Sequence, residues 1–341
     1  MKLYLLDLLL CLPLENSVSA GLVPSLSKGL TKAFRDQKLI YRWLKKIDNL
    51  GKKIQPNAPP AMEINGLSSI KEYLSNFRYL EDSGPFNDVL DKETVSAIKT
   101  YQNYFNLQVN GGLNNETLQQ ISLPRCAIPD MNFNSDMVDN VSWPKEGTEW
   151  LPKEKRNITY GFLPVSEIPE NVTKVFKDSF TRWAEATKVL NLTEARYDDA
   201  DIKIGFYIFN DSVGDEVFGG SIIRLQPEYN KKTGEIRLDA TKYWALPVEN
   251  QSLSWEESVL DLESVAMHQI GRLLGLDHTS KMDSVMYPTI LQSQQRKVQL
   301  SDYDKNNIHQ HYTTSHTETT GRCRFLTTIF SLIFLYLLLL C

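Results

Sequence analysis

Residues 261–288 read DLESVAMHQIGRLLGLDHTSKMDSVMYP, and this stretch decides the fold. The spacing of its apolar residues predicts a helix. Residues four apart share one helical face, so His268 and Arg272 point the same way. Gly275 lets the chain turn after the helix, and His278 follows three residues later. The order of helix, glycine and histidine predicts a site built around this helix rather than a plain amphipathic helix.

The same stretch resembles the active-site helix and Met-turn of the matrixins, the matrix metalloproteinase branch of the metzincins. That family has H-E-x-x-H-x-x-G-x-x-H, followed shortly by a methionine-containing turn. His268, Gly275 and His278 match the first histidine, the glycine and the third histidine, and Met286 lies in the matching turn. The resemblance implies a zinc endopeptidase in which His268 and His278 are zinc ligands.

Two positions of the motif differ in their chemistry. Gln269 stands at the general base and Arg272 at the second histidine. Catalytic zinc needs three protein ligands, and a base must accept a proton from the water at its open position. A glutamine amide cannot accept that proton, and arginine cannot ligate zinc and is always charged. A unit charge about 4 Å from a dication costs roughly 8 kcal/mol at an effective dielectric of about 20. Arg272 therefore turns away, or zinc stays out, and we expect zinc occupancy to be in question.

The composition bounds the classes of function. The chain has 341 residues and a formal net charge of −5, enough for two modest domains. It has no basic stripe, which excludes a nucleic-acid-binding surface. We expect a monomer with the ordinary composition of a globular protein.

Both ends resemble targeting signals. Residues 1–20 combine Lys2, an apolar run and a small-residue cleavage site at Ala20, which predicts a signal peptide. Residues 313–341 combine small residues, a polar spacer and an uncharged apolar tail, which predicts a GPI-attachment signal. A retained transmembrane anchor is the alternative, although the tail is short for a span. Sequons that support a secreted glycoprotein lie at Asn115, Asn140, Asn157, Asn171, Asn191, Asn210 and Asn250.

The cysteines indicate a specific role for one of them. Of the 4 cysteines, only Cys126 lies outside the two predicted targeting segments. Residues 124–130 read PRCAIPD and resemble the cysteine switch of the matrixins, P-R-C-G-x-P-D, with Ala127 replacing glycine. The resemblance implies that the Cys126 thiolate occupies the open position of the zinc and keeps the zymogen inactive. A buried structural cysteine is the alternative.

The remaining patterns predict the domain order. Residues 21–63 are read as a propeptide lead and linker. Three helical patterns within residues 64–130 resemble the peptidoglycan-binding-like prodomain of matrixins. Residues 131–312, with alternating strands and long helices, resemble the catalytic domain. We therefore expect an α+β fold of the metzincin type, which is a mixed twisted sheet with three main helices. A small helical prodomain precedes it in the chain.

A second metal site of the family is also altered. Matrixins place a structural zinc on three histidines and an aspartate, with calcium nearby, but in this chain no histidine precedes His268. Asp215 and Asp239 are the residual structural-metal positions. Arg237 takes the place of a zinc histidine, and Lys242 that of a calcium-binding glutamate, so calcium remains only possible. A structural zinc contributes folding free energy. We expect apolar packing to offset its loss, and the candidate residues are Val213, Phe218, Ile222 and Ile223.

Three hypotheses for function follow. The first is a matrixin homologue with lost or severely impaired catalysis, held at the cell surface like the plant-type GPI-linked members. It would act as a binding or decoy module for extracellular protein or peptide substrates or inhibitors. The second is an active metalloendopeptidase with a rebuilt site, in which Asp277 supplies an oxygen ligand. The third is that Arg272 pairs with the Cys126 thiolate or with Asp130 and holds the prodomain shut without metal.

Overall fold

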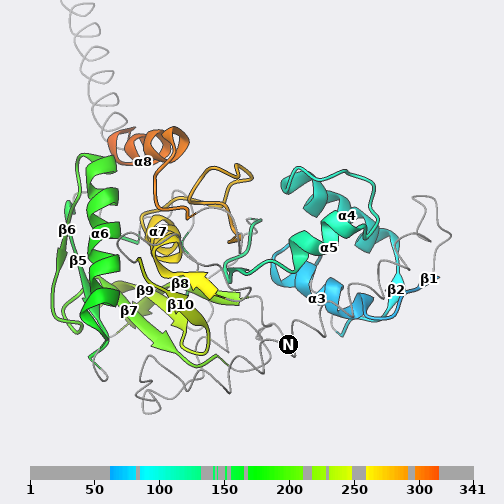
Figure 1. Cartoon of the computed structure of the whole chain (residues 1–341), viewed down its shortest axis with the longest axis horizontal. Helices are drawn as coiled ribbons and strands as arrows, with labels where there is room; N and C mark the ends of the chain where they lie inside the picture. The colour runs from blue at the N-terminus through cyan, green and yellow to red at the C-terminus, as the bar shows by residue number, and fades with distance from the viewer. Residues whose placement is uncertain are drawn as a thin grey trace, which may run out of the picture.

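Two units make up the part of the chain that the structure describes (Figure 1). The computed structural model describes residues 62–81, 85–131, 141–142, 144, 150–151, 155–164, 168–209, 217–227, 230–247, 259–290 and 296–314. A helical unit, residues 62–121, lies beside a larger unit built on a mixed sheet, and the segment after residue 121 runs from one to the other. The predicted signal peptide, Asp215, Val213 and almost all of the predicted GPI signal lie outside the described residues.

The helical unit packs three helices around one apolar cluster. Its elements are β1 (Met62–Glu63), α3 (Leu67–Asn76), β2 (Val89–Leu90), α4 (Lys92–Tyr104) and α5 (Asn115–Ile121). Side-chain oxygens cap the N-termini of α4 and α5. Asp91 accepts a hydrogen bond from the Thr94 amide, and Asn114 accepts one from the Thr117 amide. The buried amide of Gln102 bonds Gly112 and Thr117, which fixes the loop between α4 and α5.

The larger unit contains a twisted sheet in the order β3-β8-β9-β7-β5-β6, with β4 paired to β8. Its strands are β3 (Arg125–Cys126), β4 (Val141–Ser142), β5 (Asn157–Phe162), β6 (Asn191–Glu194), β7 (Ile202–Tyr207), β8 (Val217–Gln226) and β9 (Lys231–Asp239). Strands β6, β5, β7 and β9 run parallel, and β8 runs antiparallel to β9. The sheet is therefore mixed, as the α+β prediction requires.

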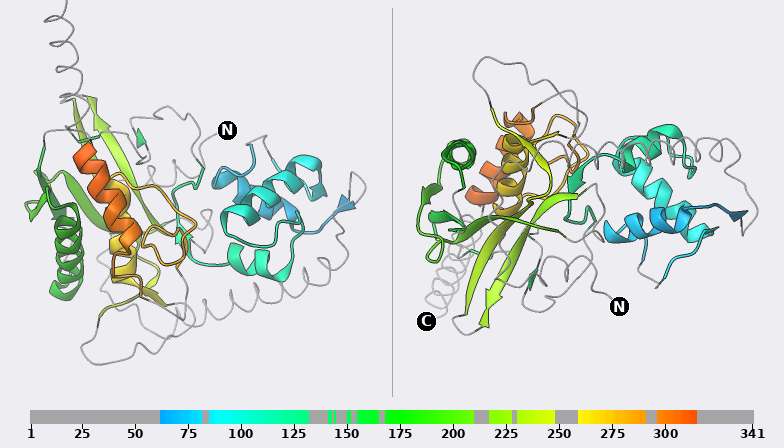
Figure 2. Two further views of the ribbon diagram at one scale, coloured as in Figure 1. Left: turned by 90° about the horizontal axis from the view of Figure 1, so that it is seen from above. Right: turned by 60° about the horizontal axis from the view of Figure 1, so that its bottom comes forward.

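Helices α6 (Glu170–Thr187) and α7 (Leu262–Leu273) pack on one face of this sheet (Figure 2). The apolar stripe of α6 is buried, and Phe180 stacks on Tyr160 of β5 with ring centroids 4.0 Å apart. The indole of Trp183 donates to the Met267 carbonyl at 2.9 Å, which joins α6 to α7. Every residue of α7 is buried. A helix that is buried on all sides can hold polar side chains only where each has a partner.

Short elements complete the larger unit. Strands β10 (Tyr243–Ala245) and β11 (Val259–Asp261) form a parallel pair, and β11 leads directly into α7. Helix α8 (Asp302–Thr314) packs across the top of the unit in Figure 1. The α+β fold and the helical prodomain are thus confirmed. Within the described ranges, no helix has both the length and the apolar composition needed to cross a membrane.

Candidate metal centre

The frame of the centre is α7 and the turn that follows it. Asp261 caps the helix by accepting from the Ser264 amide at 2.9 Å and from the Ser264 hydroxyl at 2.6 Å. Gly275 has a φ of 98°, and a Cβ there would lie 2.7 Å from the His311 ring. The turn at Gly275 therefore needs glycine. It brings His278 back beside His268, as the spacing predicted.

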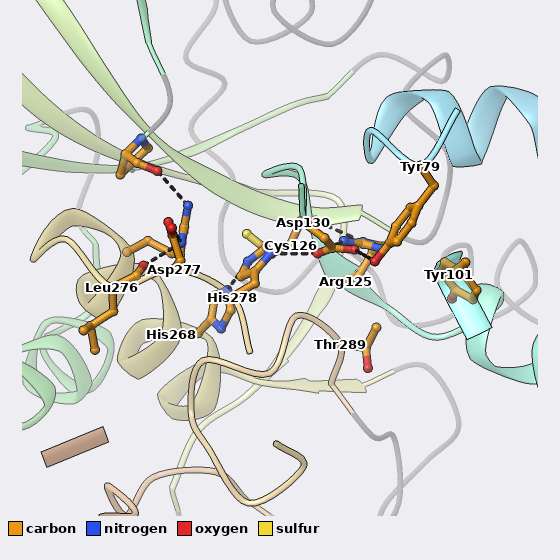
Figure 3. Close-up of polar contacts among 12 residues, drawn as sticks. Tyr79, Tyr101, Arg125, Cys126, Asp130, His268, Leu276, Asp277, His278 and Thr289 are labelled. Atoms are coloured by element: carbon orange, nitrogen blue, oxygen red, sulfur yellow. Dashed lines mark hydrogen bonds and ion pairs between the residues drawn. The ribbon is translucent and has the colours of Figure 1, made fainter. Parts of the chain in front are cut away.

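Three ligand atoms converge at this place. The Nε2 atoms of His268 and His278 lie 3.2 Å apart. The sulfur of Cys126 completes a group whose ligand atoms all lie within 4.8 Å of one another, the one His/Cys/Asp/Glu group of this kind found among the described residues. The edge of a tetrahedral zinc site with bonds of about 2.0–2.1 Å is roughly 3.3 Å long. The histidine pair therefore fits a zinc ion (Figure 3).

The hydrogen-bond partners of the two imidazoles decide which nitrogens carry protons. His268 Nδ1 lies 2.8 Å from the Val285 carbonyl, and His278 Nδ1 lies 2.8 Å from an oxygen of Asp130. Both partners are acceptors, so each Nδ1 is protonated and each Nε2 lone pair faces the other. Lone pairs so arranged repel unless a cation is bound, and such Nδ1 contacts are what metal-ligating histidines make.

Electrostatics keep these imidazoles neutral and Asp130 ionised. Burial, with the neighbouring His278, lowers the pKa of His268 well below its usual value. Burial also lowers the pKa of His278 to about 4, although its bond to Asp130 opposes this. Burial would raise the pKa of Asp130, but Arg125 and His278 outweigh it and lower that pKa to about 2. Neutral imidazoles are the form that binds a metal.

Cys126 is fully buried in β3 and is held by its backbone. Its amide donates to the Pro288 carbonyl at 3.0 Å, and the Ala127 amide donates to Gly219 of β8 at 2.9 Å. Burial raises the pKa of the Cys126 thiol. The sulfur needs a metal or a hydrogen-bond donor to be a stable thiolate here.

Gln269 supplies such a donor. Its Nε2 lies 3.3 Å from the Cys126 sulfur, and its Oε1 accepts from the Ser221 hydroxyl at 2.6 Å. Both ends of the amide are therefore occupied. Nothing in the sequence pointed to Ser221, which lies on β8, 48 residues before Gln269 in the chain.

Arg272 does not pair with Cys126 or Asp130, so the third hypothesis is wrong in its stated contacts. The guanidinium donates to the Leu276 carbonyl at 2.5 Å, to Asp277 at 2.9 Å and to the Pro144 carbonyl at 2.7 Å. Leu276 and Asp277 lie apart from the group of Cys126, His268 and His278 in Figure 3. The side chain turns away from the metal position, as the charge argument required. Asp277 is thereby ion-paired and is not in the His/Cys ligand group, which removes support from the rebuilt site.

The Met-turn packs against α7 and contacts His268 through Val285. Met286 is buried, and its sulfur would be 2.5 Å from a Cβ at Gly271 of α7. Asp304 of α8 accepts from the Ser284 hydroxyl at 2.5 Å and from the Val285 amide at 3.2 Å. The Val285 carbonyl also accepts the hydrogen bond from His268 Nδ1, so the turn fixes the orientation of this predicted zinc ligand.

In the altered structural-metal region, around the end of β9, the positively charged side chains of Arg237 and Lys242 stand where the family has metal ligands. Asp239 accepts from the Thr241 amide at 2.8 Å and lies 3.7 Å from the Lys242 ammonium. The Arg237 guanidinium lies 4.1 Å from the Tyr207 ring centroid. A calcium ion at Asp239 would have to displace Lys242. The expected packing is also present, in Phe218, Ile222 and Ile223, which are all buried.

Comparison with known proteins agrees with this architecture. Residues 149–313 match the family described as Matrixin, and residues 65–121 match a peptidoglycan binding domain. Metalloendoproteinase 5-MMP of Arabidopsis thaliana is 40% identical over 264 residues, which cover 73% of this chain and 71% of that protein. Metalloendoproteinase 2-MMP of the same plant is 34% identical over 292 residues, covering 76% of each chain. Metalloendoproteinase 1 of Glycine max is 33% identical over 260 residues, covering 74% and 84%. The chain therefore belongs to the matrixin family and carries a peptidoglycan-binding-like prodomain of the zymogen type.

Proposed function

We propose that this matrixin is a metalloendopeptidase homologue whose catalysis is lost or severely impaired. The position of Arg272 carries the proposal. In the matrixin motif this position supplies a zinc ligand, but here the side chain is committed to Leu276, Asp277 and Pro144. The larger unit is left with two histidine ligands, and a catalytic zinc site uses three protein ligands.

The missing base supports the same conclusion. Gln269 stands where the family has the glutamate that takes a proton from water, and its amide already bonds Ser221 and Cys126. An amide has no ionisable carboxylate to accept the proton. Loss of a general base costs about 10²–10⁴-fold in rate, and loss of a ligand adds to that.

The roles of the remaining site residues follow from their positions. His268 and His278 hold the zinc that the family requires, and Cys126 is the ligand supplied by the prodomain. Zinc, when bound, supplies Lewis-acid chemistry. Met286 packs against Gly271 of α7, and Val285 and Asp130 orient His268 and His278.

The place of action follows from the family. Matrixins are extracellular or cell-surface proteins, and a protease family implies protein substrates. We place this chain on the outer leaflet of the plasma membrane through a GPI anchor at residues 313–341, after removal of residues 1–20. There it binds extracellular proteins or peptides, either substrates or inhibitors. It acts as a monomer and has no nucleic-acid partner.

The test is peptide hydrolysis by the purified full chain. We expect no zinc-dependent cleavage of a general peptide substrate. Added zinc should not raise the rate of cleavage, and a chelator should not lower it. Chelator-sensitive cleavage at a rate typical of a matrixin would refute the proposal.

A further inference from the structure

We propose that Cys126 is a permanent metal ligand, and that Gln269 and Ser221 are positioning residues that hold its sulfur in place. The metal is a divalent ion bound by this sulfur and by the Nε2 atoms of His268 and His278. The prodomain of residues 64–130, which carries Cys126 after its helices, thereby stays in the mature protein as donor of the third ligand. The inference rests on the proposed function, because a working peptidase would need the thiolate to leave.

The first step is the number of ligands. Arg272 supplies none, so among the described residues that follow the prodomain, only His268 and His278 offer ligand atoms at this place. Two nitrogens bind a zinc ion weakly, and a thiolate adds the third and strongest donor. On binding, the Cys126 sulfur forms a bond to the metal and its proton passes to solvent. The ligand set is complete only while the switch segment is in place.

The second step is the orientation of the Gln269 amide. The Ser221 hydroxyl donates to Oε1 at 2.6 Å, which leaves Nε2 directed at the Cys126 sulfur at 3.3 Å. A donated N–H favours the charged thiolate, whereas a carboxylate at residue 269 would repel it. The substitution that removes the base therefore strengthens the bond between the two units.

The third step is the backbone of the switch segment, which is paired on both sides. Cys126 is in register with Gly219 of β8. On the other side, the Cys126 amide donates to Pro288 at 3.0 Å and the Ile290 amide donates to Pro124 at 2.8 Å. These bonds fix the depth at which the sulfur enters the site.

The fourth step connects the helical unit to a ligand. The buried Arg125 guanidinium bonds Asp130 at 2.7 Å and the Tyr73 hydroxyl of α3 at 3.0 Å. Tyr79 donates to the second oxygen of Asp130 at 2.6 Å, and the first oxygen faces His278. The helices, the switch segment and His278 thus share one hydrogen-bond network (Figure 3).

The fifth step is the apolar contact between the two units. Tyr287, which follows Met286, belongs to the hydrophobic cluster of the helical unit. Its ring meets Phe105 edge to face, with centroids 5.7 Å apart. Nearby, the Asn106 amide donates to the Ser280 carbonyl at 3.3 Å. Removal of the helical unit would uncover part of this cluster, which favours its retention.

The main test is metal content of the full chain, loaded with zinc, dialysed and measured by elemental analysis. We expect close to one zinc in the unaltered protein, very little in Cys126→Ser, and close to one in His309→Ala, whose exposed imidazole lies outside the ligand group. Cobalt exchanged for zinc should show a sulfur-to-cobalt charge-transfer band that Cys126→Ser lacks. Full zinc in Cys126→Ser, no zinc in the unaltered protein, or no such band would overturn the proposal.

Ser221→Ala tests the positioning residues, with Ser179→Ala as the matched control. Ser179 is another fully buried serine, but its hydroxyl bonds Val175 inside α6. We expect Ser221→Ala to bind zinc about tenfold to a hundredfold more weakly in chelator competition and to shift the cobalt band, as losses of second-layer hydrogen bonds do. Ser179→Ala should change neither. Equal zinc affinity in the two variants would refute the role of Ser221.

Retention of the helical unit is tested by cutting the chain. A site for a specific protease is inserted within residues 132–140, and the cut protein is passed over a sizing column. Both fragments should elute together with their zinc. Separate elution of the helical fragment would overturn permanent retention. Peptide hydrolysis by the cut protein is a separate readout, since chelator-sensitive cleavage would refute the proposed loss of catalysis itself.

Discussion

Arg272→His restores the histidine of the family motif, and we expect it to destabilise the protein. The guanidinium makes three bonds, to Leu276, Asp277 and Pro144. The shorter imidazole cannot make all three, so buried carbonyls and a carboxylate lose their partner. The pair with Asp277 is only partly buried, because Asp277 is 23% exposed, but each of the two bonds to carbonyls is a hydrogen bond to a charged group and is worth about 1.5–3 kcal/mol. We therefore expect a loss of about 3–5 kcal/mol in the free energy of unfolding.

The assay is urea unfolding of the full chain in the presence of a chelator. Arg196→His is the matched control, because Arg196 is exposed and pairs with Asp199 on the surface. Surface pairs contribute about 0–1 kcal/mol, so this control should unfold almost like the unaltered protein. Zinc should then restore part of the stability of Arg272→His, by about 2.7 kcal/mol at a hundred times its dissociation constant. If Arg272→His lost less than about 1 kcal/mol in chelator, the account of Arg272 as a structural anchor would be refuted.

Three further predictions concern the support of the centre, each measured as the free energy of unfolding. Gly271→Ala places a Cβ 2.5 Å from the Met286 sulfur and should cost about 1–3 kcal/mol by overpacking; an unchanged midpoint would contradict this. Asp261→Ala removes the cap of α7 and should cost about 1–2 kcal/mol; a loss under about 0.3 kcal/mol would argue against the cap. Burial lowers the pKa of Lys297 to about 8. Because this folded-state pKa lies below the unfolded one, the lysine opposes folding below pH 8, and stability rises as the pH rises from about 8 to about 10.5. Lys297→Met should therefore be more stable near pH 7, with the difference shrinking across that window; a constant difference would refute the assignment.

The sequence predicted the parts of the centre that depend on local spacing. His268, Gly275 and His278 lie within eleven positions, so the end of α7 and the turn at Gly275 bring the two histidines together locally. The caps at Asp91 and Asn114 are equally local, since each side chain accepts from an amide three residues ahead. The cysteine switch was found by its motif rather than by physical reasoning.

The parts that the sequence did not reveal depend on distant chain segments. Arg272 meets Pro144 across 128 residues, and Ser221 meets Gln269 across 48. No periodicity encodes such contacts, because they arise only when the sheet and α7 pack together. The tendency of a buried guanidinium to find carbonyl acceptors was a usable signal, and it argued against a pairing with the thiolate.

The contacts in the altered structural-metal region were also predicted only in part. Loss of the histidines was visible in the sequence, and packing was expected to replace the metal. The structure adds ionic contacts, in which Arg237 lies 3.9 Å from Glu235 and Lys242 lies 3.7 Å from Asp239. Arg237 and Lys242, which take the places of family metal ligands, thus make contacts of their own beside the apolar packing.

The measurement that tests loss of catalysis most directly is a double reversion, Gln269→Glu with Arg272→His. Both this variant and the unaltered chain are cut at the protease site placed within residues 132–140, separated from the prodomain fragment in chelator and denaturant, refolded, loaded with zinc and given one peptide substrate. We expect chelator-sensitive cleavage by the double variant at least about 10²-fold faster than by the unaltered sequence, which should show none above background. Equal chelator-sensitive cleavage by both proteins would contradict the claim that these two substitutions removed the activity.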